Sequence, residues 1–300
     1  MVHAMGEIIF GKEQEVRLAL ACLLARGHLL IEDLPGVGKT TLAQVLARVM
    51  GLEYQRVQFT SDLLPADVTG ISIFNQETRG FEFHPGPLFS QLVLADEVNR
   101  ATPKAQSALL EAMEEYQVTV DGQTHALPEP FFVIATQNPF HQIGTFPLPE
   151  SQLDRFLIRI HLGYPDKQAE RELLSGRDRR DVLKEMQPSM RPEQLLAMQK
   201  QVNDVQVAGP ILDYIQSLLL HSRNSPQFSL GLSPRAGLAL IQAAKAWAYM
   251  MGRDMVVPDD VQAVLHGVVA HRLRTTAEAD EDDMSDAAAK LLRGVPVLAA

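Results

Sequence analysis

The sequence predicts an α/β fold, in which helices cover both faces of a mostly parallel sheet, followed by a small all-helical domain. Two observations support this prediction. Short apolar runs alternate with amphipathic segments up to about residue 165, as they do where buried strands alternate with helices. Beyond about residue 166 only helical spacing continues, and proline or glycine separates the segments. We therefore expect one domain over residues 1–165 and a second over residues 166–300.

The first domain is predicted to contain four buried strands and three helices. Leu42, Val45, Leu46 and Val49 follow the i, i+3, i+4, i+7 spacing of a helix face. Thr102 and Pro103 supply an N-cap and a first-turn proline to a later helix. The strands are expected at residues 28–32, 54–59, 92–96 and 131–137, and the helices at residues 13–27, 39–50 and 103–116.

The composition narrows the possible partners. The chain has 300 residues, of which 46% are hydrophobic and 21% charged, as in ordinary globular proteins. Its formal net charge of −10 disfavours sequence-independent binding of nucleic acid. Cys22 is the only cysteine, so no intramolecular disulfide can form, and we expect this residue in the core. No apolar run approaches the roughly 18 residues of a membrane span, and the first residues lack a secretory pattern, so a cytoplasmic protein is expected.

The stretch "EDLPGVGKTT" (residues 32–41) nearly matches the phosphate-binding pattern G-x-x-x-x-G-K-[ST], with Asp33 in place of the first glycine. In such loops consecutive backbone N–H groups and a helix N-terminus surround the phosphates, lysine reaches the outer phosphates, and Ser/Thr holds magnesium. These tasks fall on Gly36 to Thr41. Asp33 lies where the chain leaves the strand, and it need not line the phosphate cradle.

Polar residues also follow two other predicted strands. Asp96 and Glu97 end the apolar run "LVLA", and two buried carboxylates are costly without a cation. With Mg-ATP nearby, Asp96 can support the metal and Glu97 can polarise a water molecule. Asn138 follows the strand "FFVIATQ" and is placed to orient that water, although a lone asparagine there is more often a turn residue.

Seven stretches occur in the order seen in the MoxR family of AAA+ ATPases, and the chain resembles that family over nearly all of its length. They are "EDLPGVGKTTLA", "FTSDLLPADVTG", "HPGPLF", "LVLADEVNRATPKAQSALLEAMEEYQVTVDG", "IATQNP", "LPESQLDRF" and "LSPRAG". The resemblance implies an AAA+ core with a helical lid, ATP and Mg²⁺ as cofactors, a hexameric ring, and a partner with a von Willebrand factor A domain.

The same resemblance implies roles for individual residues. Asn138 matches sensor 1, Arg155 in "LDRF" resembles an arginine finger that reaches a neighbouring subunit, and Arg235 in "LSPRAG" resembles sensor 2 of the lid. Each arginine taken alone would more often form a surface ion pair. Walker A comprises Gly36, Val37, Gly38, Lys39, Thr40 and Thr41; Walker B comprises Asp96 and Glu97; Thr40 and Asp96 are the expected metal-binding residues.

Several segments keep more than one interpretation. Residues 61–89 resemble a helix-2 insert, and "QVTVDGQTHAL" is predicted to form a pre-sensor 1 hairpin around Asp121-Gly122. Both could contact a substrate, or be edge hairpins without a partner. "GKEQEV" resembles the segment that flanks adenine, and the role of Arg100 stays open between coupling subunits and coupling the active site. The acidic run at residues 277–286 is a solvated loop or helix start, or a partner contact.

Three functions are compatible with these features. The first is an ATP-driven, chaperone-like ring that remodels or activates a protein client, as the resemblance implies. The second is a nucleic-acid motor, because related helicases share both insertions; the acidic charge and the absence of a basic, aromatic-rich stretch oppose it. The third is the ATPase subunit of a metal chelatase, which would require a large metal-binding partner.

Overall fold

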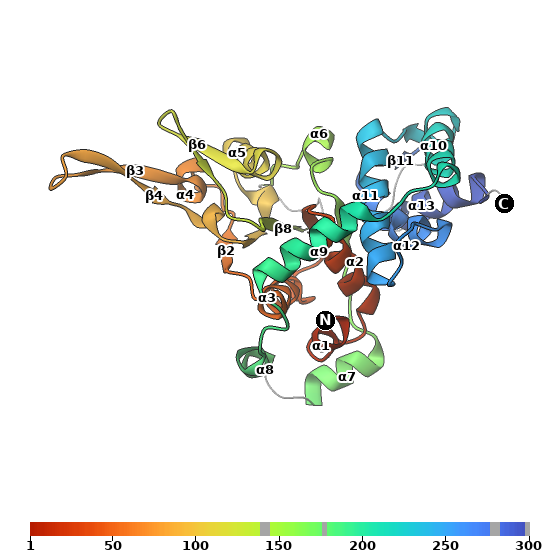
Figure 1. Cartoon of the computed structure of the whole chain (residues 1–300), viewed down its shortest axis with the longest axis horizontal. Coiled ribbons are helices and arrows are strands. Elements are labelled where there is room, and N and C mark those ends of the chain that lie inside the picture. Colours follow the sequence, from red (N-terminus) through yellow and green to blue (C-terminus); the bar gives the residue numbers. More distant parts are fainter. Residues whose placement is uncertain (139–144, 176–178, 277–282, 298–300) are drawn as a thin grey trace. The chain divides into compact units, whose positions relative to one another are not determined.

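The computed structural model describes residues 1–138, 145–175, 179–276 and 283–297 (Figure 1). The chain forms two compact units, neither of which is continuous in sequence. Unit 1 comprises residues 1–17, 28–148 and 160–196, and unit 2 comprises residues 18–27, 149–159 and 197–300. The predicted domains divide the chain once, near residue 165, whereas each compact unit contains segments from both sides of that residue. The segment at 149–159, which includes Arg155, belongs to unit 2.

A five-stranded sheet forms the centre of the α/β fold, as predicted. Its strands are β2 (Tyr54–Gln58), β5 (Leu92–Asp96), β8 (Phe132–Gln137), β1 (Leu29–Glu32) and β9 (Ile158–Ile160), in that spatial order. The pairs β2–β5, β5–β8 and β8–β1 are parallel. All residues of β1, β5 and β8 are buried, which explains why each strand begins with an apolar run. Only β9 was not predicted, because it has three residues with an arginine at its centre.

The helices around this sheet begin close to their predicted positions. They are α2 (Glu13–Leu24), α3 (Lys39–Met50) and α5 (Pro103–Glu115). The Thr102 side chain accepts a hydrogen bond from the Ala105 N–H at 3.5 Å and so forms the predicted N-cap of α5. Further helices of unit 1 are α1 (Val2–Gly6), α7 (Lys167–Ser175), α8 (Arg179–Glu185) and the 3₁₀ turn η2 (Val98–Arg100). Helical spacing predicted α7, which the sequence analysis assigned to the second domain, and the other three were not predicted.

The two insertions form hairpins. Residues 61–89 contain α4 (Pro65–Thr69), β3 (Gly70–Asn75), β4 (Gly80–Pro85) and the 3₁₀ turn η1 (Pro87–Phe89), and the β3–β4 ribbon extends away from the other elements of unit 1 (Figure 1). The second hairpin joins β6 (Gln117–Val120) to β7 (Gln123–Ala126). Asp121 and Gly122 at its turn have φ values of 50° and 78°, as a type I′ turn requires, which confirms that prediction. The Phe83 ring stacks on His125 with centroids 3.9 Å apart, so the hairpins support each other.

Unit 2 is mainly helical. Its helices are α6 (Glu150–Leu153), α9 (Pro192–Asp204), which begins in unit 1, α10 (Gly209–Asn224), α11 (Pro234–Met250), α12 (Pro258–Val269) and α13 (Asp283–Gly294). The prediction of an all-helical domain needs one correction, because β10 (Phe228–Leu230) and β11 (Arg274–Thr275) form a short antiparallel pair. Strands this short have no detectable alternating pattern. Trp247 and Cys22 are buried, as predicted.

Two sequence features are bounded by the described residues. Residues 277–282 of the acidic run lie outside them, so the run is represented only by the start of α13. Among the helices that the structure describes, none is long and apolar enough to cross a membrane.

A buried histidine fixes the start of β1 against two elements of unit 1. The Val133 N–H donates to His28 Nδ1 at 3.0 Å, so Nε2 carries the proton and donates to the Met113 carbonyl at 3.1 Å. These bonds tie the last turn of α5 to β8. Burial lowers the pKa of His28 from 6.5 to about 4, because removing the ring from solvent disfavours its charged form.

We predict that His28 makes the protein less stable as the pH falls below about 6.5. Between pH 6.5 and 4 the unfolded chain binds a proton at this ring and the folded chain does not, so unfolding becomes easier by about 1.4 kcal/mol per pH unit. Urea unfolding followed by circular dichroism at pH 7.5, 6.0 and 5.0 measures this loss. The control is His28→Gln, which cannot titrate. If both proteins lose the same stability over this range, the prediction is wrong.

Candidate nucleotide-binding and catalytic site

The loop between β1 and α3 is an open cradle of backbone. Gly36 and Gly38 have φ values of 88° and 101°, a conformation that favours glycine, and a Cβ on either residue would meet nothing within 4 Å. Gly38 is the N-cap of α3 and makes no side-chain capping bond. The first N–H groups of α3 therefore have no side-chain acceptor from their N-cap. Together with the positive end of the helix dipole, they suit an anion such as a phosphate group.

Lys39 directs its ammonium group to the base of this loop. Nζ donates to the carbonyl oxygens of Asp33 and Leu34 and, at 3.0 Å, to Oδ1 of Asn138. Lys39 is only 8% exposed, and burial lowers the pKa of its ammonium group. Three neighbouring carboxylates oppose that effect, those of Asp33, Asp96 and Glu97. Three acceptors around Nζ match the three N–H donors of an ammonium group.

Asp33, the residue that departs from the common pattern, has a structural task. Its Oδ2 accepts hydrogen bonds from the N–H groups of Leu162 and Gly163, both at 2.6 Å, and its Oδ1 accepts one from Leu34 at 2.8 Å. The carboxylate is buried and points away from the cradle into the chain that follows β9. The prediction that Asp33 need not line the cradle is confirmed. The residue instead fastens the phosphate-binding loop to residues 162–163.

Asp96 ends β5 with both carboxylate oxygens engaged. Oδ1 accepts from Thr136 Oγ1 at 2.5 Å, and Oδ2 accepts from Arg56 through Nε at 3.1 Å and Nη2 at 2.6 Å. Thr136 lies on β8 and Arg56 on β2, so the strands on either side of β5 orient this side chain. The sequence analysis identified neither residue, because only the strand order brings them next to Asp96. The alternation of polar residues along "YQRVQ" was the only available signal.

Glu97 is held by a similar arrangement one residue later. Its backbone has a left-handed conformation with φ of 56°, and its N–H donates to Thr136 Oγ1 at 2.9 Å. Oε1 accepts from Asn138 Nδ2 at 3.1 Å, while Oε2 accepts from Gln58 Nε2 and pairs with Arg100 Nε, each at 3.0 Å. A left-handed, non-glycine residue is costly and persists only where its surroundings enforce it. These contacts fix the carboxylate at the edge of the sheet.

Asn138 connects the two charged groups of the site. It is 4% exposed, accepts from Lys39, and donates to Glu97. The structure thus brings Lys39, Asn138 and Glu97 into one hydrogen-bonded chain, and Arg100 joins it through Glu97. Arg155 follows α6 and Arg235 lies in the first turn of α11, both in unit 2, and their proposed roles remain predictions.

The residues present fit Mg-ATP. A nucleotide-bound Mg²⁺ usually takes few protein ligands, because phosphate oxygens and waters complete its shell. Among the described residues no group of three or more His, Cys, Asp or Glu could hold a metal alone. Thr40 in the first turn of α3 and Asp96 at the end of β5 would therefore share the ion with the phosphates. The open cradle, the buried ammonium group and the adjacent carboxylates suit this ligand.

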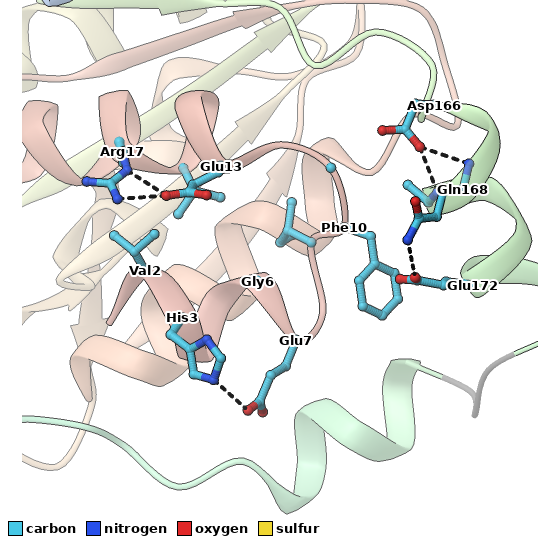
Figure 2. A pocket seen from close by; sticks show the side chains of 14 residues that line it. Val2, His3, Gly6, Glu7, Phe10, Glu13, Arg17, Asp166, Gln168 and Glu172 are labelled. Atoms are coloured by element: carbon cyan, nitrogen blue, oxygen red, sulfur yellow. Dashed lines mark hydrogen bonds and ion pairs between the residues drawn. The ribbon is translucent and has the colours of Figure 1, made fainter.

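A separate cavity of about 840 Å³ lies beside α1, α2 and α7 (Figure 2). Gly11, Glu13 and Val16 of the "GKEQEV" segment contribute to its wall, and no residue from Gly36 to Thr41 does. Its carboxylates already have partners. Glu13 pairs with Arg17 at 2.6 Å, and Asp166 accepts from the N–H groups of Gln168 and Ala169 (Figure 2). This acidic lining does not suit phosphates, and the proposed contact of "GKEQEV" with adenine remains a prediction.

Two family models match the chain. Residues 28–158 match the model described as "ATPase family associated with various cellular activities (AAA)", and residues 220–291 match the model described as "AAA lid domain". The first range contains the cradle and the strands that carry Asp96 and Asn138, and the second begins near the end of α10.

Similar proteins cover almost the whole chain. A protein named YeaC of Bacillus subtilis is 46% identical over 93% of this chain and 87% of its own length. Chaperone MoxR1 of Mycobacterium tuberculosis is 40% identical over 95% of this chain and 77% of its own length. Protein MoxR of Paracoccus denitrificans is 32% identical over 90% of this chain and 86% of its own length. A crystal structure of a candidate ATPase from Cytophaga hutchinsonii superposes with a TM-score of 0.87 at 36% identity, covering 99% of this chain and 94% of that one.

We predict that restoring the consensus glycine at residue 33 damages the protein. Asp33→Gly removes the acceptor of three backbone N–H groups, of which two belong to residues 162 and 163. It should lower the free energy of unfolding by at least about 2 kcal/mol. Asp33→Asn keeps the shape and one acceptor oxygen and should lose less. Chemical denaturation of the three proteins measures the order. Equal stability of Asp33→Gly and the unchanged protein would contradict the assigned role.

Proposed function

This chain belongs to the MoxR family of AAA+ ATPases, and on that premise we propose that it hydrolyses Mg-ATP in order to remodel or activate a protein client. The observation that supports the proposal best is the hydrogen-bonded chain of Lys39, Asn138 and Glu97 beside an open phosphate cradle. Such a chain places a cation for phosphate, a polar group for water and a carboxylate base at one edge of the sheet.

Each residue has a distinct part in this reaction. Residues 36–41 bind the phosphates through backbone N–H groups, and Lys39 adds charge at the outer phosphates. Bound Mg²⁺ would neutralise developing charge on the phosphates, with Thr40 and Asp96 as its protein ligands. Glu97 accepts the proton of the attacking water, which Asn138 orients. Glu97 is engaged by Asn138, Gln58 and Arg100, and a carboxylate has about four acceptor positions, so about one is left for that water.

We further propose that Arg155 and Arg235 complete the site across subunits and from the lid, respectively. Arg155 lies in unit 2, as does the lid helix α11, whose N-cap Ser233 accepts from the Ala236 N–H at 3.1 Å and sets Arg235 in the first turn. A finger in trans requires an assembly, and we propose a ring, with six subunits by family resemblance. The proposed setting is the cytoplasm, with a von Willebrand factor A domain protein as partner.

The proposal of a protein client draws on a relative and on the insert hairpin. The relative that is 40% identical is named a chaperone. In this chain the β3–β4 ribbon carries Phe74 and Phe81, which are 51% and 75% exposed and whose ring centroids lie 5.4 Å apart. Exposed aromatic pairs are typical of protein-binding surfaces. The net charge of −10 favours this function over a nucleic-acid motor, and a chelatase would need a large metal-binding partner for stimulation.

We predict that two single variants separate binding from hydrolysis. Lys39→Ala should abolish measurable ATP binding, because a charge-assisted contact to the phosphates is lost. Glu97→Gln should bind ATP normally but turn over at least about 100-fold more slowly, the scale of a general base. Calorimetry and phosphate release measure the two effects. If Lys39→Ala binds with normal affinity, the cradle is not the nucleotide site; if Glu97→Gln keeps its turnover, another group activates water.

We predict that the aromatic pair is needed for client work and not for hydrolysis. The double variant Phe74→Ser, Phe81→Ser should keep basal turnover, yet lose about tenfold or more of its ATP-dependent suppression of aggregation by a heat-unfolded model protein. Gln76→Ser, an exposed change in the same ribbon, is the control. Duplex and single-stranded DNA are tested in parallel. Turnover that rises with DNA and falls with salt would favour the motor function over the proposed one.

A further inference from the structure

Arg272 is buried in unit 2 and makes hydrogen bonds with every nitrogen of its guanidinium group. It lies in the short link between α12 and β11, and its side chain is 5% exposed. Nε donates to the Asp154 carboxylate at 2.6 Å, Nη2 donates to the carbonyls of Asp154 at 3.1 Å and Phe156 at 2.6 Å, and Nη1 donates to those of Leu157 at 3.1 Å and Val268.

Four of these five bonds end on the residues that surround Arg155. They fasten the residue before it and the two residues after it. Phe156 is fully buried, and its carbonyl also accepts a hydrogen bond from His271 Nε2 at 2.9 Å. On the other side, the Arg155 N–H donates to the Gln152 carbonyl at 3.2 Å. The backbone on both sides of Arg155 is thereby fixed to the end of α12.

A guanidinium group is suited to this task. It presents five N–H donors in a planar fork, so one side chain can satisfy a carboxylate and several carbonyls that point in different directions. A lysine at the same place would keep the charge but would bring donors to one point only. Burying an arginine is costly unless its donors are satisfied, and here the acceptors come almost entirely from the Arg155 loop.

We propose that Arg272 is a positioning residue for hydrolysis, which holds the Arg155 loop in the geometry that an arginine finger needs. This inference rests on the proposed role of Arg155 in trans. A finger acts on charge that develops in the transition state, and a misplacement of about 1 Å can cost about 100-fold in rate. Arg272 follows α12 by three residues, so its hydrogen bonds also connect the Arg155 loop to the end of that helix.

The test compares Arg272→Lys, Arg155→Ala and the double variant. Arg272→Lys should lower kcat by about 10- to 100-fold and leave the ATP dissociation constant unchanged. Arg155→Ala should lower kcat by about 10³ to 10⁵. The double variant should be no slower than Arg155→Ala, because a finger that is absent cannot be misplaced. Two results would overturn the inference while the proposed finger role of Arg155 still stands. One is a further loss of kcat in the double variant. The other is a normal kcat in Arg272→Lys when Arg155→Ala is impaired. Full activity of Arg155→Ala would instead refute the proposed finger itself.

Mixed assemblies give a second readout that a purely structural defect would not move. Arg272→Lys subunits retain Glu97, and Glu97→Gln subunits retain a well-placed Arg155, so mixing them creates complete composite sites and activity should partly return. Mixing Arg272→Lys with Arg155→Ala creates no complete site and should restore nothing. Native mass spectrometry must show mixed assemblies in both cases. Recovery in the second mixture, or none in the first, would contradict the inference.

Arg253→Lys is the matched control for loss of an ion pair. Arg253 pairs with the buried Asp260 at the opposite end of α12 from Arg272, about 15 Å along the helix axis. It belongs to the same unit and does not touch the Arg155 loop. Its substitution should lower the melting temperature as Arg272→Lys does, without the kcat loss. If Arg253→Lys slows turnover to the same degree, the effect of Arg272 is one of general stability and the inference fails.

Discussion

The nucleotide-binding part of this protein depends on one constraint: a lysine ammonium group is kept charged while it is only 8% exposed. A buried cation is unstable unless nearby groups compensate for the lost water. Here two backbone carbonyls and the Asn138 amide oxygen accept hydrogen bonds from it, and three carboxylates are nearby. The same requirement explains why carboxylates end β5, where they would otherwise be costly. Arg56 plays the corresponding part for Asp96 from the neighbouring strand.

The strand order converts this electrostatic requirement into a site. Parallel strands direct their carboxyl ends to one edge, and β1, β5 and β8 deliver Lys39, Asp96 with Glu97, and Asn138 to that edge. The flanking strand β2 adds Arg56 and Gln58 in register with β5, since Gln58 lies opposite Asp96. The polar groups therefore hold one another before any ligand arrives. Preorganisation of this kind lowers the reorganisation needed during the reaction.

The sequence predicted the parts of this arrangement that are local. The strand–loop–helix around Lys39, the N-cap at Thr102 and the Asp121-Gly122 turn each follow from a few adjacent residues. It could not predict contacts that depend on which strands are neighbours, and so Arg56, Gln58 and Thr136 were missed. Asp33 was correctly placed outside the cradle, but the N–H groups that donate to its carboxylate, at residues 162–163, are 129 and 130 positions away in the chain. The short strands β9, β10 and β11 have too few residues to show a period.

The structural role of Arg272 also depends on residues that are distant in the sequence. In "AHRLRTT" Arg272 resembles one more exposed basic residue after a helix, because only the Val268 carbonyl among its acceptors is nearby in the sequence. The others come from residues 154–157, and a buried guanidinium group can persist only where such acceptors are fixed. The dependence is mutual, since Arg272 in turn supplies donors to the carbonyls of Asp154, Phe156 and Leu157. A loop that gives its acceptors to one arginine is rigid as a consequence. Rigidity is what an arginine carried on that loop would require if it must stabilise charge on another subunit.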